Sequence, residues 1–191
     1  MLKKTYLILR SMFLWTVSAL HFFTVCTFLV ILGVFVDPRK NDRPQRVFFR
    51  NILRLVGVGF EVRYGPGFDR QRTSIFICNH VNIFDPFVIY SAIPQFVRGL
   101  EVETHFKVPA YGWMMRRFGN IPVPSSNSPA GFVKLLKRAK AALDSGVSLI
   151  VFAEGTRTLT GRVGPFHKGA FVIAQHTCYP IVPMSVVGSY R

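Results

Sequence analysis

The first 58 residues are patterned differently from the rest of the chain. Residues 11–36 form a 26-residue run without Asp, Glu, Lys or Arg. This run exceeds the roughly 20 residues that a helix needs to cross the hydrocarbon core of a bilayer. A cleaved signal peptide would have a shorter apolar core and a small-residue cleavage site, and the sequence VFVDPRK offers no such site. We therefore predict a membrane helix that is retained, and we expect His21 within it to face a neighbouring helix or the interface.

The next segment, residues 44–60, predicts a basic amphipathic helix. Its apolar positions are Val47, Phe48, Ile52, Leu55 and Val56, and its cations are Arg46, Arg50 and Arg54. A helix with this spacing can lie in the headgroup plane of a membrane. It can equally pack against the protein with its arginine face in solvent, and the sequence leaves both interpretations open.

Beyond residue 58 the pattern alternates between short apolar runs and helical stretches. We expect strands in residues 73–78, 120–123, 147–152 and 180–187. The stretch 128–146 has helical spacing and ends at Gly146, as helices often do. Such alternation predicts a single α/β domain with a largely parallel central sheet flanked by helices. We accordingly divide the chain into membrane-anchoring helices, residues 1–58, and an α/β domain, residues 59–191.

The composition indicates which classes of partner this domain binds. The 191 residues carry 24 Lys and Arg against 9 Asp and Glu, a formal charge of +15, which favours anionic partners. The mean hydropathy of +0.31 favours a membrane surface over nucleic acid, so no nucleic acid is expected. The three cysteines have no C-x-x-C spacing, which indicates neither a disulfide framework nor a zinc site.

The charges that flank the apolar segment give a slight preference for a cytoplasmic location of the C-terminal side. Three cations precede the segment and four follow it: Lys3, Lys4, Arg10, Arg39, Lys40, Arg43 and Arg46.

The stretch CNHVNIFDP, residues 78–86, places a histidine and an aspartate in an apolar setting. His80 follows a predicted strand at its carboxyl end, where open α/β sheets bind ligands. Asp85, just before Pro86, is a candidate helix N-cap. The turn between the two can also fold back so that the Asp85 carboxylate accepts the Nδ1 proton of His80, which would leave Nε2 as a general base.

A second polar loop, residues 154–157 with the sequence EGTR, follows the apolar run SLIVF. Gly155 permits a tight turn, and Arg157 offers a planar fork of donors that suits a phosphate. Taken alone, the loop is also consistent with a salt-bridged surface turn.

Four ordered blocks together resemble the glycerolipid acyltransferase family of the 1-acylglycerol-3-phosphate type. They are NHVNIFD and EGTR, about 70 residues apart, with FKVPAYGWMMRRFGNIPV between them and YPIVPMSV after them. The resemblance covers roughly residues 60–187.

The resemblance implies an enzyme that makes phosphatidic acid from 1-acyl-sn-glycerol-3-phosphate. In such an enzyme His80 deprotonates the acceptor hydroxyl, Asp85 orients His80, and the hydroxyl attacks a fatty acyl thioester carried on acyl carrier protein or coenzyme A. The implied acceptor-binding residues are Glu154, Gly155, Thr156 and Arg157, with Lys107 and Lys168 as further electrostatic contributors. Neither a cofactor nor a metal is expected. The implied location is a membrane, with the catalytic domain on the cytoplasmic side of a bacterial inner membrane.

Departures from the family keep other acceptors open. Ser125 stands near a position where the family often has an arginine, so a lyso-ornithine lipid or another lysolipid is an alternative acceptor. Where relatives have a Lys-x-Glu-Leu run, this chain has Glu101, Glu103 and His105, which we expect on one face of a strand, turned to solvent or to the edge of the substrate. Because the sequence stops at Arg191, soon after the fourth block, we expect the sheet edge there to be short or covered.

Two rival functions remain at this stage. One is a hydrolase in which Cys78 is the nucleophile and His80 its base, although Cys78 suits a small buried residue better. The other is a non-catalytic, basic, membrane-anchored protein that binds anionic lipid or nucleic acid.

Overall fold

The structure is a computed structural model that describes residues 2–38, 41–125 and 128–190. Of the cations that flank the apolar segment, Arg39, Lys40 and the side chain of Lys3 lie outside the described residues. In chain order the elements are α1 (Leu2–Phe35), α2 (Arg43–Leu55), β1 (Ile75–Cys78), α3 (Asp85–Ala92), β2 (Val97–Val102), the 3₁₀ helix η1 (Glu103–Lys107), α4 (Tyr111–Arg117), β3 (Ile121–Val123), α5 (Pro129–Asp144), β4 (Ser148–Phe152), α6 (Gly169–Thr177) and β5 (Ile181–Met184).

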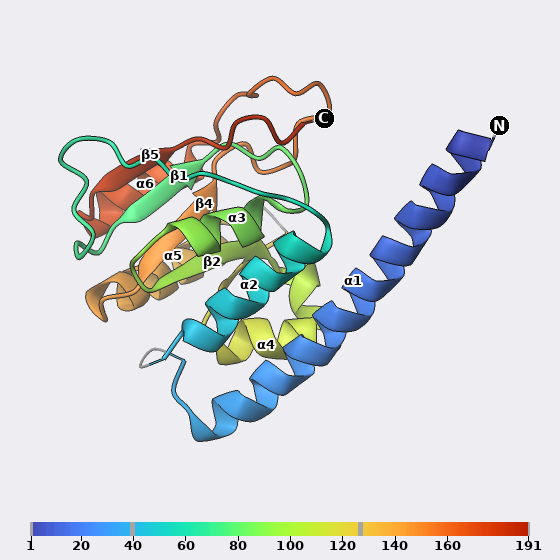
Figure 1. The fold of residues 1–191 in the computed structure, drawn as a ribbon. Coiled ribbons are helices and arrows are strands. Elements are labelled where there is room, and N and C mark those ends of the chain that lie inside the picture. The colour runs from blue at the N-terminus through green and yellow to red at the C-terminus, as the bar shows by residue number, and fades with distance from the viewer. Residues whose placement is uncertain (1, 39–40, 126–127, 191) are drawn as a thin grey trace.

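The five strands form one parallel sheet in the order β3-β2-β4-β1-β5. The predicted α/β fold with a parallel sheet and flanking helices is thus confirmed (Figure 1). β1 and β4 are central neighbours, with Cys78 in register with Phe152. Because the strands are parallel, the loops after β1 and β4 leave the sheet at the same edge.

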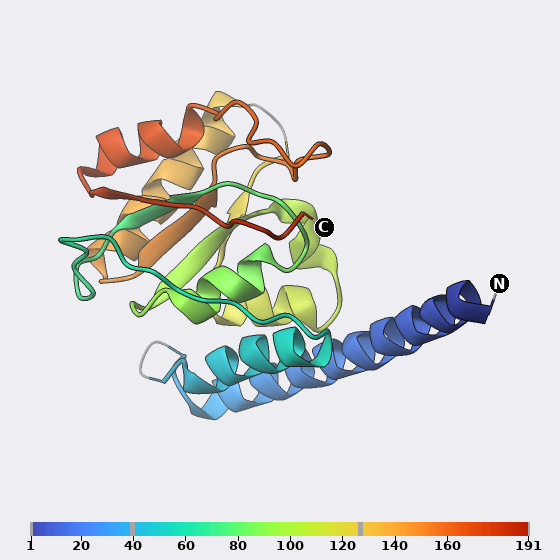
Figure 2. The ribbon, with the colours of Figure 1, turned by 45° about the horizontal axis from the view of Figure 1, so that its top comes forward.

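β1 is covered on both faces, which explains its unbroken apolar sequence. Ile75 and Ile77 join a core with α5 and α6, whereas Phe76 and Cys78 join a second core on the opposite face. Figure 2 shows α1 and α2 on the side of the sheet away from α6. The sheet therefore separates two apolar cores.

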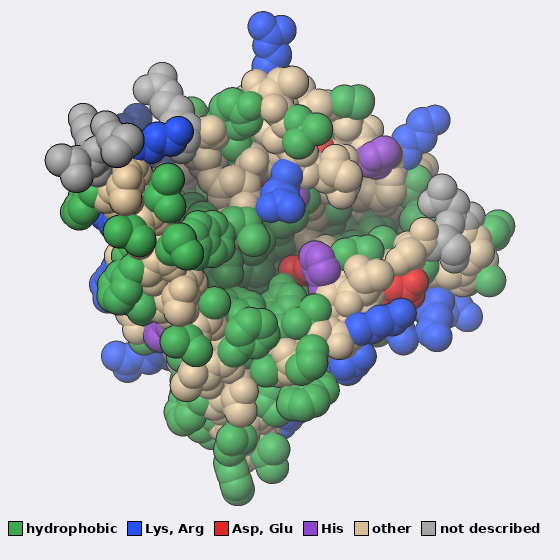
Figure 3. Space-filling model, turned by 90° about the vertical axis from the view of Figure 1, so that its right-hand side faces the viewer, with side chains coloured by type: hydrophobic (Ala, Val, Ile, Leu, Met, Phe, Trp, Pro, Cys, Tyr) green, Lys and Arg blue, Asp and Glu red, His purple; other side chains and the backbone are tan. Residues whose placement is uncertain are grey.

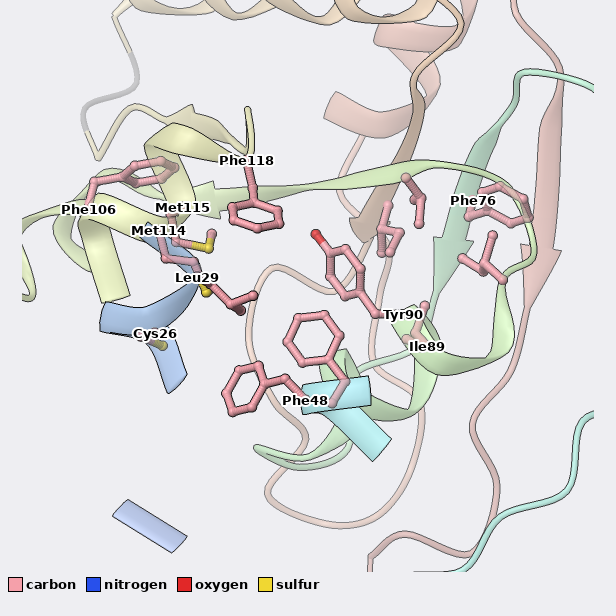
Figure 4. Packing of buried hydrophobic residues seen from close by; sticks show 14 of the residues in the cluster. Cys26, Leu29, Phe48, Phe76, Ile89, Tyr90, Phe106, Met114, Met115 and Phe118 are labelled. Carbon is pink, nitrogen blue, oxygen red and sulfur yellow. The ribbon is translucent and has the colours of Figure 1, made fainter. Parts of the chain in front are cut away.

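The second core extends from the sheet to the N-terminal helices. Phe48 of α2, Leu29 of α1 and Met114 of α4 are each at most 2% exposed and pack in one cluster with α3 (Figure 4). The ring of His21 lies 5.8 Å from that of Phe48, so the expectation that His21 faces a neighbouring helix is confirmed. The C-terminal half of α1 thus packs on the α/β domain, while its N-terminal half extends beyond it (Figure 1).

Helix α2 is a packed helix on its inner face. Phe48, Phe49 and Ile52 are buried, but Val47 and Leu55 are exposed. Arg46, expected on a solvated or headgroup face, instead donates to the main-chain oxygens of Tyr90, Ile93 and Gln95 at the end of α3. A cation is favourable there because the unpaired carbonyls of a helix end carry partial negative charge.

Among the described residues, one helix segment, Lys4–Phe35, is long and apolar enough to cross a membrane by length and composition. Large apolar side chains such as Phe13, Trp15 and Leu20 are more than half exposed along it. A contiguous exposed apolar surface of this kind is typical of membrane contact.

The strands differ from the expected pattern in two places. β2 was not expected, because its run VRGLEV is interrupted by Arg98 and Glu101. Glu101, Glu103 and His105 do not share a strand face, because β2 ends at Val102 and the next five residues form η1.

Candidate active site

The histidine and the aspartate of residues 78–86 meet at the carboxyl end of β1. The Asp85 Oδ2 atom lies 2.9 Å from the Nδ1 atom of His80. Asp85 is 1% exposed, and the side chain of His80 is 18% exposed. With Nδ1 held by the carboxylate, the Nε2 atom of His80 is available for a proton from a bound molecule.

Asp85 does not cap α3 in the expected way. The helix begins at Asp85 itself, with Phe84 as N-cap and no side-chain capping bond. The Oδ2 atom of Asp85 instead accepts hydrogen bonds from the main-chain N–H groups of Val81 and Asn82, which precede it in the chain, at 2.5 and 2.8 Å. These donors fix the carboxylate beneath the imidazole, so the turn folds back upon His80.

The loop after β4 holds the backbone of His80 from the other side. The Glu154 Oε1 atom accepts the main-chain N–H of His80 at 2.7 Å, and the main-chain N–H of Thr158 donates to the His80 oxygen at 2.9 Å. The other carboxylate oxygen of Glu154 accepts the N–H of Gly164 at 2.7 Å. Both Glu154 oxygens are thus engaged by backbone, and Glu154 is only 8% exposed.

The side chain of Phe152 packs against the imidazole of His80. Its ring stacks on that of His80, with centroids 4.0 Å apart and an interplanar angle of 19°. This contact could not be predicted from a motif, because it follows from the register of β1 and β4. Phe152 is the last residue of the apolar run before EGTR, and only that position hints at its role.

A large cavity opens beside His80. Its volume is about 1090 Å³, and its walls come from α1, α2, α3, α4, α5 and α6 together with the strand ends. Figure 3 shows it as a hollow of hydrophobic side chains with a histidine and an acidic side chain at its edge. A cavity of this size and character suits a long apolar ligand.

The predicted site residues divide into three groups around this cavity. His80, Gly155 and Arg157 line it, and Asp85 and Glu154 lie directly behind His80. The exposed side chains of Thr156, Lys107 and Lys168 do not line it. Among the described residues the Arg157 guanidinium has no carboxylate partner, so the surface salt bridge considered for this loop does not form there.

Gly155 holds the turn in a conformation that other residues resist. Its φ is +71°, and a Cβ atom there would lie 3.0 Å from the Cδ2 atom of His167. The positive φ therefore favours glycine, and a Cβ atom there would press on the His167 ring.

Cys78 is unsuited to be a nucleophile. It is 1% exposed, as expected of a small buried residue. Burial, together with the charges of Asp85 and Glu154, raises the pKa of its thiol to about 12. The thiol therefore stays protonated at neutral pH, which argues against the hydrolase.

Among the described residues, no three His, Cys, Asp or Glu side chains gather closely enough to hold a metal ion. The site consists of a histidine, carboxylates, an arginine and an apolar cavity.

Comparison with known proteins agrees with this arrangement. Residues 59–187 match the family model described as Acyltransferase. The chain belongs to the acyltransferase family. The resemblance inferred from the four sequence blocks is thereby confirmed.

Several relatives of this chain are named 1-acyl-sn-glycerol-3-phosphate acyltransferase. A chloroplastic 1-acyl-sn-glycerol-3-phosphate acyltransferase of Arabidopsis thaliana is 33% identical over 191 residues, covering 95% of this chain and 52% of the relative. One from Cocos nucifera is 35% identical over 152 residues, covering 80% of this chain and 49% of the relative. The chain thus spans about half the length of these two relatives.

A solved structure matches the fold. The 1-acyl-sn-glycerophosphate acyltransferase PlsC of Thermotoga maritima superposes with a TM-score of 0.77 at 22% identity, covering 98% of this chain and 77% of the other. At that identity the match supports the fold, including the long N-terminal helix.

Proposed function

We propose that this acyltransferase transfers a fatty acyl group from an acyl thioester to the free hydroxyl of 1-acyl-sn-glycerol-3-phosphate, giving phosphatidic acid. The observation that carries the proposal is the 2.9 Å contact between His80 Nδ1 and Asp85 Oδ2 at the wall of an apolar cavity of about 1090 Å³. The names of the Arabidopsis and Cocos relatives support the choice of acceptor.

In the proposed reaction the Nε2 atom of His80 takes the proton of the acceptor hydroxyl. The oxygen attacks the thioester carbonyl and forms a C–O bond, while the carbonyl electrons move to its oxygen. When that tetrahedral intermediate collapses, the C–S bond breaks and the leaving thiolate takes the proton from the imidazolium. Asp85 stabilises the transient positive charge of His80, and no acyl-enzyme is formed.

The loop after β4 has two roles in this scheme. Arg157, on the cavity wall, binds the acceptor phosphate through its planar donors. Glu154 acts as a positioning residue, because its carboxylate holds the His80 backbone rather than facing the cavity. Lys107 and Lys168 contribute only longer-range positive potential, since neither lines the cavity.

The apolar tails of both substrates explain the membrane helix. The N-terminal helices, residues 1–58, anchor the enzyme, and the acyltransferase domain, residues 59–191, works at the bilayer surface. We place that domain on the cytoplasmic side of a bacterial inner membrane, where acyl carrier protein or coenzyme A supplies the acyl chain.

One observation favours a second acceptor. Ser125, near the position of an arginine common in the family, gives its main-chain N–H to the Glu103 carboxylate at 3.1 Å. Position 125 therefore supplies no cation for an acceptor phosphate. Lyso-ornithine lipid is the corresponding alternative acceptor.

Purified protein in detergent micelles tests the proposal. Each of several lysolipids is combined with acyl-coenzyme A and with acyl carrier protein thioester, and the acylated product is measured by mass spectrometry. The wild type should acylate 1-acyl-sn-glycerol-3-phosphate, and His80→Ala should lose at least about 100-fold in rate. An unchanged rate in His80→Ala, or no product from any pair of substrates, would refute the proposal.

A further inference from the structure

The cavity of His80 contains a second histidine-carboxylate pair, which the proposed reaction does not use. The Nδ1 atom of His105 lies 2.9 Å from the Oε2 atom of Glu101, and the hydroxyl of Tyr111 is 3.4 Å from the other oxygen. All three residues line the cavity. The Glu101 side chain is 17% exposed and that of His105 is 52% exposed, so both can be reached from the cavity.

The chemistry of this cluster is that of a hydrogen-bond acceptor. The Nδ1 atom of His105 is in hydrogen-bond contact with Glu101, and in the tautomer that donates from Nδ1 the Nε2 atom carries a lone pair. The Glu101 carboxylate has lone pairs beyond those used by His105 and Tyr111. Burial and the nearby Glu101 charge raise the pKa of Tyr111, so its phenol remains protonated and satisfies one carboxylate oxygen. A group that binds here must bring N–H or O–H donors.

The position of the cluster relates it to Arg157. Glu101 lies on β2, near its carboxyl end, and Arg157 follows β4, its hydrogen-bonded neighbour. Both residues line the same cavity, Glu101 from the end of β2 and Arg157 from the loop that follows β4. The cavity wall thus offers both a guanidinium and a carboxylate.

We propose that Glu101, supported by His105 and Tyr111, binds an ammonium group on the headgroup of the acceptor lysolipid while Arg157 binds the anionic group. The acceptors would then include zwitterionic lysolipids that carry N–H donors. The inference rests on the proposed acyl transfer and specifies its acceptor. An ammonium suits the subsite better than a hydroxyl does, because charge-assisted hydrogen bonds are about twice as strong as neutral ones.

A panel of acceptors tests this inference with the full-length protein. Lysophosphatidylethanolamine and lyso-ornithine lipid carry ammonium N–H donors, lysophosphatidylcholine carries the same charge without them, and 1-acyl-sn-glycerol-3-phosphate carries no cation. The wild type should acylate at least one of the first two with a lower KM than lysophosphatidylcholine. The acceptor with the lower KM identifies the source of the ammonium.

The variant Glu101→Gln keeps the shape of the side chain and removes its charge. It should raise the KM for the ammonium-bearing acceptor about tenfold. The kcat for that acceptor and the KM for 1-acyl-sn-glycerol-3-phosphate should stay unchanged. Glu103→Gln is the matched control, because Glu103 lies two residues away, is exposed and does not line the cavity.

Three results would overturn the inference. The first is turnover of 1-acyl-sn-glycerol-3-phosphate alone, which leaves the proposed function intact. The second is an equal effect of Glu101→Gln on all acceptors, which would assign Glu101 a structural role. The third is an equal effect of Glu103→Gln. No turnover of any acceptor would instead refute the proposed function and, with it, this inference.

Discussion

The ring of Phe152 lies against the ring of His80, with the centroids 4.0 Å apart. Phe152 is the last residue of β4, and His80 follows the end of β1 by two residues. The register of β1 and β4 brings the two rings together. The imidazole is thus held by Asp85 at one nitrogen, by the loop after β4 through its backbone, and by Phe152 across its face. Three separate contacts fix one side chain.

Replacing Phe152 by Leu should lower kcat about fivefold and leave KM nearly unchanged. Leucine keeps the apolar contact but lacks the flat face, and an aromatic pair contributes about 0.5–1.5 kcal/mol beyond its buried area. Steady-state kinetics measure the effect. Phe76→Leu, on the neighbouring strand, is the control for a general loss of core packing. Equal losses of kcat in both variants would contradict a specific role for Phe152.

Replacing Asp85 by Asn should lower kcat at least about 100-fold while the protein stays folded. The amide oxygen can still accept the N–H groups of Val81 and Asn82, but the negative charge that favours the imidazolium is lost. Circular dichroism establishes folding and the transfer assay gives kcat. Turnover at the wild-type level would leave Asp85 with only a role in the conformation of the turn.

Replacing Arg157 by Lys should raise the KM for the acceptor several-fold more than the KM for the acyl donor. A point charge replaces a planar fork, and the phosphate loses its bidentate partner. The same change at Arg162, which is exposed and does not line the cavity, should have little effect. An effect confined to the donor would reassign Arg157 to the thioester carrier.

Gly155→Ala should destabilise the fold by at least about 1 kcal/mol and reduce activity. A positive φ costs an alanine about 1–2 kcal/mol, and the added methyl group presses on His167. Gly57→Ala separates the two effects, because Gly57 has a φ of +75° but no atom near its Cβ position. Thermal melting and the transfer assay should show loss of activity in Gly155→Ala only. Equal activity in the two variants would contradict the steric argument.

Cys78 should resist alkylation from pH 7 to pH 9, and Cys78→Ala should retain activity. The pKa of its thiol is raised to about 12 by burial, so the reactive thiolate is scarce below that pH and forms only as the pH rises through it. Maleimide labelling of the folded protein followed by mass spectrometry checks this, with the exposed Cys178 as the reactive control. An inactive Cys78→Ala that remains folded would revive the hydrolase mechanism.

The sequence was sufficient to predict those elements whose structure is determined by residues close together in the chain. The apolar runs of β1 and β4 and the helical spacing of α5 depend on burial alone, and the motif histidine and aspartate could be placed at the end of β1. β2 could not be predicted because it contains Arg98. That side chain is 1% exposed, stacks on the ring of Phe96 and donates to main-chain oxygens, including that of Phe118. A charge buried by distant partners looks like a surface charge in the sequence.

The same limit applies within the site. The roles of Arg46 and Glu154 depend on backbone groups that lie 44 or more residues away in the sequence. The pairing of His105 with Glu101 required the strand to end at Val102 and the chain to turn. Motifs could single out the candidate site residues, whereas the contacts that orient them come from tertiary structure.

The hold of Arg46 on the end of α3 has a geometric consequence. The same helix begins, at its other end, with the aspartate that contacts the His80 imidazole. One short helix of eight residues therefore links the N-terminal helix α2 directly to the His80–Asp85 pair.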